Sequence, residues 1–234
     1  MTLLSEAVRA ELRRAYEAPD RHYHDLRHIE ALLRLAQEHA AAIADPDAVE
    51  AAIWFHDAIY DTRRNNNEER SAELAIARLT GSAAEDRIAH IAAMIRATAG
   101  HRLPDFADSA AGPTRDCALF LDFDLAIFGS APAAFAAYEH AVRREYGWVP
   151  DALWTAGRRQ VLAGFLARPT IYATPQFRAS HEAAARRNLA EAIGAIGSGH
   201  RRHSRLTHAA RRAKHAAVRR TLPYSSGSVV NISG

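Results

Sequence analysis

Residues 48–57 read AVEAAIWFHD, an apolar segment that ends in an adjacent histidine and aspartate, His56 and Asp57. The apolar run predicts a largely buried helix, and a buried aspartate without a partner is costly. A neutral imidazole nitrogen beside an anionic oxygen suits Mn, Fe, Zn or Mg better than a metal that prefers thiolates. The pair therefore predicts a metal site, and the alternative is a helix that ends with an aspartate in water.

A second pair of chemical groups lies upstream. Residues 23–29 read YHDLRHI, in which His24 and His28 stand four residues apart. On a helix the two side chains would share one face, so one could bind a metal while the other reaches a bound substrate. Because the chain holds 13 histidines, a polar helix surface is the alternative.

A third signal lies downstream, where residues 119–128 read LFLDFDLAIF. Two acids, Asp122 and Asp124, interrupt a strongly apolar helix. A cation is their natural partner, although an arginine from a neighbouring helix would satisfy them equally well.

The rest of the chain shows apolar residues at helical spacing, with little alternation of period two. This pattern predicts an all-α fold. The helices that we expect span 3–17, 25–42, 46–59, 67–79, 83–98, 114–128, 131–146, 151–167 and 177–195.

Composition divides the 234 residues into a body, 1–196, and a tail, 197–234. With 48% apolar residues over the whole chain, the body can fill one core. The tail holds eight of the 30 basic residues and no acid, which leaves 22 basic against 27 acidic residues in the body. We therefore expect no nucleic-acid binding by the body and a basic, disordered tail. The alternative is a basic amphipathic helix at 205–220 that makes weak contact with an acidic partner, RNA or a membrane surface.

The single cysteine, Cys117, excludes an intrachain disulfide and favours a reducing compartment. The N-terminal residues carry charges too frequently for a secretory signal, and no apolar run reaches membrane-spanning length. We therefore expect a cytoplasmic protein without a membrane partner.

Taken together, a histidine, a later His-Asp pair and a distant aspartate on a helix resemble the ligand order of the HD superfamily of metal-dependent phosphohydrolases. The segments that carry a closer resemblance, to a bacterial subgroup of predicted HD phosphohydrolases, are YHDLRHIEALL, AIWFHDAIYD, NEERSAELA, DFDLAIFG, REY and EAAARRNL. The resemblance covers about residues 5–196 and implies an HD-domain helical bundle.

The resemblance also implies a ligand set. His28 resembles the first ligand, His56 and Asp57 the paired motif, and Asp124 the last. Asp124 is preferred over Asp122 because Leu125 follows it, as in the Asp-Leu pattern of the superfamily. Asp122 would then orient a ligand. The implied cofactor is one or two divalent ions (Mn, Fe, Zn, Mg, Co or Ni), with Asp57 bridging if there are two.

Residues 23–28, YHDLRH, also resemble the Tyr-His-Asn-x-x-His segment of cyclic-nucleotide phosphodiesterases, with Asp25 in place of the asparagine. This similarity implies that His24 donates a proton to the leaving oxygen. Residues 95–101, IRATAGH, resemble a further segment of the same enzymes, which would bring His101 to the site.

Residues 56–62, HDAIYDT, resemble the His-Asp-x-x-Glu-Asp-Thr of guanosine tetraphosphate hydrolases. Asp61 matches one acid and would orient water or support a ligand, whereas Tyr60 stands where that family has glutamate. Glu68, at the start of the next helix, either caps that helix or supports the site.

These resemblances imply a hydrolase that uses metal-activated water on a phosphoester or phosphoanhydride, in a nucleotide or another small phosphorylated metabolite. The arginines that we consider for phosphate contact are Arg143, Arg144, Arg158, Arg168 and Arg186. One alternative is a di-iron oxygenase of the same fold, with His90 or His101 as added ligands. The other is a non-catalytic module that senses a nucleotide.

Overall fold

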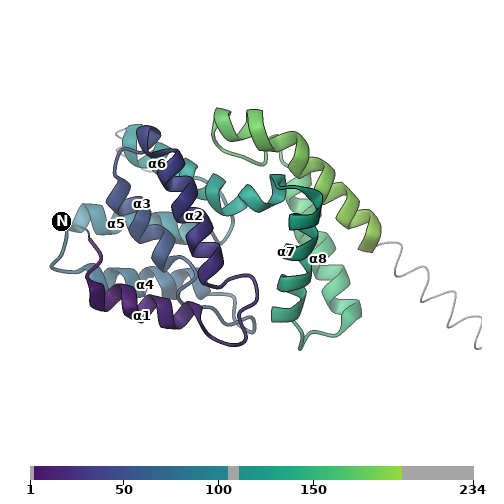
Figure 1. Ribbon diagram of the computed structural model, residues 1–234, viewed down its shortest axis with the longest axis horizontal. Coiled ribbons are helices and arrows are strands. Elements are labelled where there is room, and N and C mark those ends of the chain that lie inside the picture. Colours follow the sequence, from purple (N-terminus) through teal and green to yellow (C-terminus); the bar gives the residue numbers. More distant parts are fainter. Residues whose placement is uncertain (1–2, 105–110, 197–234) are drawn as a thin grey trace, which may run out of the picture. The chain divides into compact units, whose positions relative to one another are not determined.

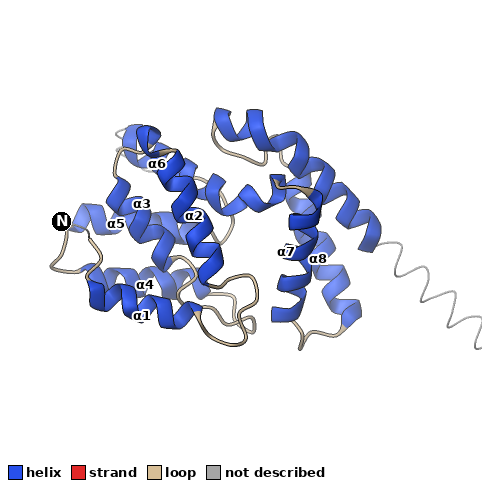
Figure 2. Cartoon of the chain, in the orientation of Figure 1, coloured by secondary structure: helices blue, strands red, loops and turns tan. Residues whose placement is uncertain are grey.

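The computed structural model describes residues 3–104 and 111–196, and within these ranges every regular element is a helix (Figures 1 and 2). The all-α prediction is therefore confirmed for this part of the chain. The helices are α1 (Glu6–Tyr16), α2 (Leu26–Glu38), α3 (Pro46–Phe55), α4 (Asn67–Leu79), α5 (Glu85–Ala97), α6 (Ala111–Asp124), α7 (Pro132–Glu145), α8 (Asp151–Leu166) and a last helix over 175–196, with short 3-10 helices η1 (Ala40–Ala42) and η2 (Leu125–Gly129).

Contacts divide the chain into two units, residues 1–191 and 192–234, and the features described below all belong to the first. The predicted basic tail, 197–234, and its alternative helix at 205–220 lie outside the described residues.

Helix α3 is the centre of the core. Pro46 occupies its first turn and Asp45 caps it by accepting a hydrogen bond from the Ala48 amide, as the Asp-Pro pair in the sequence favours. Seven of its ten residues are buried, and it packs against α1, α2, α4, α5 and α6. Each large apolar side chain buried in this way contributes about 2 kcal/mol. The central position of α3 fixes where the residues at its C-terminal end must lie.

The predicted helix 46–59 is wrong at its end, because α3 stops at Phe55. The Arg21 guanidinium donates to the carbonyl oxygens of Asp57 and Ala58, at 2.7 and 3.0 Å. These carbonyls are satisfied without a further helical turn. His56 and Asp57 consequently leave the helix and enter a turn.

Helix α2 begins at Leu26, after His24, so His24 and His28 cannot share a face of this helix. Asp25 caps the helix, since its side chain accepts a hydrogen bond from the Arg27 amide. His24 therefore precedes the helix, whereas His28 lies in its first turn. The predicted shared helix face is wrong, although the two rings still lie 6.0 Å apart between centroids.

Helix α6 ends at Asp124, where the chain continues as η2. The observed α-helix thus begins three residues before the predicted helix 114–128, and the last part of the predicted range is a 3-10 helix. Among the described residues, no single helix is long and apolar enough to cross a membrane. Residues 112–129 and 132–145 reach that length and hydropathy only when taken together, and the two segments are bent by 103° relative to each other.

Helices α7 and α8 pack against η2 and the loop before α2. Tyr138 of α7 meets Tyr23 edge to face at 4.5 Å between ring centroids, and Phe165 of α8 meets Phe128 of η2 at 5.0 Å. Edge-to-face pairs of this kind contribute about 1 kcal/mol beyond their buried area. These contacts bring α7 and α8 to the same side of the fold as His24.

Candidate metal centre

Three side chains form a compact group of candidate metal ligands, and a fourth side chain contacts two of them. His28 comes from α2, His56 and Asp57 from the turn after α3, and Asp124 from the end of α6. One ligand atom each from His28, His56 and Asp57 lies within 4.8 Å of the others. Asp124 Oδ1 joins them, at 3.2 Å from His28 Nε2 and 3.8 Å from His56 Nε2. The sequence predicted this set of four, and the fold brings its members together.

The ring of His56 is held with one nitrogen turned toward the cluster. Its Nδ1 lies 2.9 Å from the carbonyl oxygen of Ile53, and a carbonyl can only accept, so Nδ1 carries the hydrogen. Nε2 is then the nitrogen that faces the other groups, 3.0 Å from Asp57 Oδ2 and 3.2 Å from His28 Nε2. Such an outer hydrogen bond is the usual way in which proteins orient a metal-binding histidine.

The electrostatics of the cluster favour a positive charge. Burial opposes protonation of His56, but the carboxylates of Asp57 and Asp124 outweigh it and raise the pKa of His56 to about 9. Burial likewise disfavours the ionised form of Asp57, yet His56 and His24 hold its pKa well below the ordinary value. The pKa of Asp124 is lowered in the same way, against burial, by hydrogen bonds from His101 and His28. Two carboxylates and two buried imidazoles therefore stabilise a cation at their centre.

The shortest separations between the donor atoms match those around a divalent ion. Ligand atoms at about 2.1 Å from an ion lie roughly 3.0 to 3.4 Å apart in octahedral and tetrahedral sites. The shortest separations in the cluster, 3.0 Å and 3.2 Å, fall in this range, whereas the distances from His28 Nε2 to Asp57 Oδ2 and from His56 Nε2 to Asp124 Oδ1 are longer, at 3.9 and 3.8 Å. Nitrogen and carboxylate donors without a thiolate suit Mn, Fe, Zn, Co, Ni or Mg.

His101 contacts the cluster from the loop after α5. Its Nε2 lies 2.7 Å from Asp124 Oδ2, so it orients the carboxylate from the side opposite His28. The backbone of His101 is in the left-handed region, with φ of 46°, which a non-glycine residue adopts at some cost. Arg168 stabilises this turn by donating to the carbonyl oxygens of Gly100 and His101, at 2.8 and 2.9 Å.

His24 lies beside the cluster and is bound to a buried glutamate. Its Nδ1 is 2.7 Å from Glu145 Oε2, and the Tyr60 hydroxyl donates to the same oxygen at 2.9 Å. Burial lowers the pKa of His24, but Asp57 and Glu145 more than compensate and raise it. Burial alone would raise the pKa of Glu145. The hydrogen bond and charge of His24, together with hydrogen bonds from backbone amides, outweigh burial and lower this pKa to about 2.

A pocket of about 960 Å³ opens over this site. His24, Asp57, Asp124 and His101 line it, and so do four arginines, Arg64, Arg102, Arg158 and Arg168. Of the arginines that the sequence analysis considered, Arg158 and Arg168 line the pocket, whereas Arg143, Arg144 and Arg186 are not among its lining residues. The pocket that contains the four cluster-side residues is therefore also lined by cationic side chains.

Three predicted residues lie apart from the four converging side chains. The carboxylate of Asp61 is 44% exposed and accepts hydrogen bonds from the Arg63 amide and the Arg64 side chain. Glu68 lies in the first turn of α4 and lines the pocket. Asp122, which is 1% exposed, accepts from the amides of Ala173 and Thr174 and from the Thr174 hydroxyl. Asp122 thus anchors the segment before the last helix.

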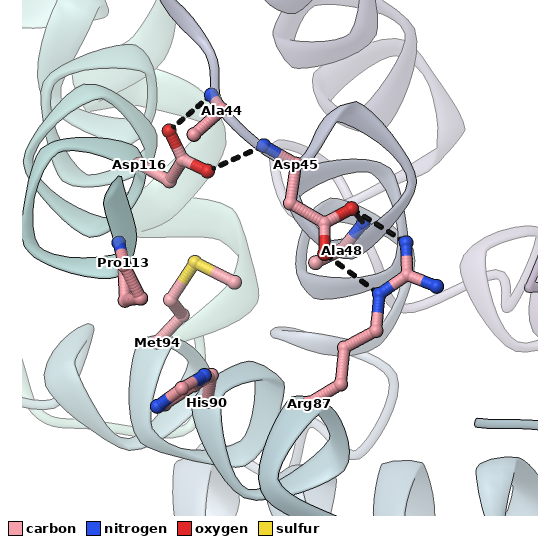
Figure 3. A pocket seen from close by; sticks show the side chains of 8 residues that line it. All are labelled: Ala44, Asp45, Ala48, Arg87, His90, Met94, Pro113 and Asp116. Atoms are coloured by element: carbon pink, nitrogen blue, oxygen red, sulfur yellow. Dashed lines mark hydrogen bonds and ion pairs between the residues drawn. The ribbon is translucent and has the colours of Figure 1, made fainter. Parts of the chain in front are cut away.

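His90, considered as an added ligand, lines a different pocket of about 100 Å³ (Figure 3). There, Asp116 binds the amides of Ala44 and Asp45, and Asp45 forms an ion pair with Arg87. The two pockets share no lining residue. Of the two histidines named for the oxygenase alternative, His101 contacts Asp124 of the cluster, and His90 lines this separate pocket.

Sequence reasoning assigned no role to Glu145 or Arg21, although both shape the site. Glu145 lies in the REY segment of the resemblance, near the end of the predicted helix 131–146. Its partners are more than 80 residues distant in the chain. Such a contact has no local signal in the sequence.

Comparisons of the chain with protein-family models, with curated proteins and with solved structures found no match.

Proposed function

We propose that this protein is a metal-dependent hydrolase of phosphoesters or phosphoanhydrides with an HD-type helical bundle. The observation that carries the proposal is the convergence of His28, His56, Asp57 and Asp124 beneath a pocket that is lined by arginines. The ligand types follow the order of the HD superfamily, and the shortest separations between donor atoms suit a divalent ion.

The residues that would hold the ion are these four, with His101 orienting Asp124. A divalent ion held there would supply an activated water and would neutralise charge on a phosphate. His24 lies at the pocket wall, where it can donate a proton to a leaving oxygen.

The pocket supports a phosphorylated substrate. Arg158 and Arg168 line it and are held in place, the first by Glu139 and the Tyr138 hydroxyl and the second by backbone carbonyls. A guanidinium that is fixed in this way loses little conformational freedom when it binds phosphate oxygens. Aromatic rings such as Tyr146 and Trp154 line the same pocket, and they suit the organic part of a nucleotide or another metabolite.

The test combines elemental analysis with a substrate panel. The purified protein is loaded in turn with Mn, Fe, Co, Ni, Zn and Mg, its metal content is measured, and hydrolysis of nucleotides, phosphoesters and pyrophosphate is assayed. We expect Asp57→Ala to lose both metal and turnover. Asp61→Ala is the matched control, because Asp61 lies in the same loop but is exposed and bound to arginine.

Full metal content and activity in Asp57→Ala would overturn the proposal. Iron-dependent oxygen consumption would assign the site to a di-iron oxygenase instead. A metal-loaded protein that binds nucleotides but hydrolyses no compound of the panel would be a sensing module.

A further inference from the structure

We propose that Glu145 positions His24 as a proton donor, and that the substrates are phosphate esters of aliphatic alcohols. This inference rests on the proposed function and adds to it a positioning residue and a substrate class. It is carried by the hydrogen bonds that meet at one buried carboxylate.

Glu145 accepts five hydrogen bonds, and its side chain has no exposed surface. Oε1 accepts from the backbone amides of His22, Tyr23 and His24, at 2.8, 2.7 and 3.0 Å. Oε2 accepts from His24 Nδ1 and from the Tyr60 hydroxyl. One oxygen thus fixes the backbone that carries the histidine, and the other fixes the histidine ring.

The arrangement determines which nitrogen of His24 can meet a substrate. A carboxylate only accepts, so Nδ1 carries a hydrogen and is occupied by Glu145. The ring of Tyr60 lies against the imidazole at 4.5 Å between centroids and restricts its rotation. His24 lines the pocket beside Asp57 and Asp124, so Nε2 is the nitrogen left to act there.

The reaction that this geometry would serve is the hydrolysis of a phosphate ester. The oxygen of a water forms a new bond to phosphorus while the bond from phosphorus to the ester oxygen breaks. The leaving oxygen keeps the electron pair and takes the proton from His24 Nε2. The proton that the water loses returns to His24, so that one ester and one water give one alcohol and one phosphate.

A fixed proton donor matters most when the leaving group is strongly basic. An aliphatic alkoxide needs a proton as it departs, whereas a nitrophenolate or the phosphate of an anhydride departs readily without one. A buried carboxylate that is devoted to holding a donor therefore points to alkyl phosphate esters and away from anhydrides.

The experiment compares leaving groups. The full-length protein loaded with Mn²⁺ is assayed with ethyl, phenyl and 4-nitrophenyl phosphate and with pyrophosphate. We expect Glu145→Gln to lower kcat for ethyl phosphate by about 100-fold and for 4-nitrophenyl phosphate by less than about 3-fold. Glu182→Gln is the matched control, since Glu182 also accepts backbone amides, of Ile171 and Tyr172, and lies outside the pocket lining.

A double-mutant cycle separates positioning from a general loss of structure. In a His24→Gln background, Glu145→Gln should cost almost nothing more, because both variants remove the same donor. In the metal-free protein, the nitrogen NMR signals of His24 should show hydrogen on Nδ1 in the parent and change in Glu145→Gln. If Glu145→Gln does not fold, Glu145→Asp, which keeps the charge at a greater distance from the ring, should show the same dependence on leaving group.

Equal losses for all leaving groups, or additive effects in the cycle, would overturn the role of Glu145. Faster turnover of pyrophosphate than of ethyl phosphate by the parent protein would overturn the substrate class. Neither result would affect the proposed hydrolase. If the parent bound metal but hydrolysed none of the substrates, the proposed function would fail as well.

Discussion

His28 Nε2 and His56 Nε2 lie 3.2 Å apart, although no local element joins the two residues. His56 Nδ1 donates a hydrogen bond to the carbonyl oxygen of Ile53. In a neutral His56, Nε2 therefore carries a lone pair, which points toward His28. Either a proton or a metal ion must lie between these nitrogens and the two carboxylates beside them. The fold thus concentrates two imidazole nitrogens and two carboxylates that need a proton or a metal ion between them.

The first prediction concerns thermal stability. A divalent ion that binds the folded state alone stabilises it by about 2.7 kcal/mol at a concentration 100 times its Kd. We expect Mn²⁺ to raise Tm by several degrees and EDTA to reverse the rise, as measured by calorimetry. His28→Gln should abolish the response to metal. An equal rise in that variant would show that the ion binds elsewhere.

Much of the fold could be predicted from the sequence because its signals are local. The apolar run in α3 indicated a buried helix, and Asp45-Pro46 marked its start. The preference for Asp124 over Asp122 rested on the residue that follows, and the structure places Asp124 beside the histidines.

The parts that could not be predicted depend on contacts between distant residues. Helix α3 ends early because Arg21, from the loop before α2, binds the carbonyls that follow it. Asp61 matched a family motif, yet two neighbouring arginines hold it at the surface. Glu145 serves the site only because α7 folds back onto the loop that holds His24. None of these contacts has a periodicity or spacing that a single sequence reveals.

A second prediction tests the turn that holds His101. Arg168→Met removes two hydrogen bonds to a backbone that already has positive φ, so the turn should relax and His101 should release Asp124. Outer residues of this kind typically change metal affinity by 10- to 100-fold, and we expect about a 10-fold loss. Titration calorimetry with Mn²⁺ measures it.

The matched control is Arg178→Met. Arg178 also donates to two backbone carbonyls, those of Ala173 and Thr174, and these lie before the last helix. A similar loss of affinity in both variants would mean that the effect comes from general loosening of the structure.

A third prediction concerns acid stability. The pKa of Glu145 is about 2 in the folded protein and ordinarily 4.5, so the folded state favours the ionised form. This stabilisation is complete above pH 4.5 and is lost as the pH falls toward 2, with a total of at most about 3 kcal/mol. Urea denaturation from pH 6 to pH 2.5 should show the loss. Glu145→Gln should flatten this part of the profile, and an unchanged profile would contradict the assignment.

The last prediction distinguishes the structural role of Asp122 from the metal-binding role of Asp124, both in α6. Asp122 is buried and binds two amides and a hydroxyl, so Asp122→Ala leaves the amides of Ala173 and Thr174 without their partner. An unsatisfied buried donor costs about 1 to 3 kcal/mol, and we expect a total loss of about 3 kcal/mol in the free energy of unfolding. Metal content should remain that of the parent. Asp124→Ala should instead lose the metal, and any destabilisation of the metal-free protein should come from the loss of the contacts of Asp124 with His28 and His101. Denaturation and elemental analysis of both variants measure the two effects, and metal loss in Asp122→Ala with retention in Asp124→Ala would reverse the assignment of the ligand.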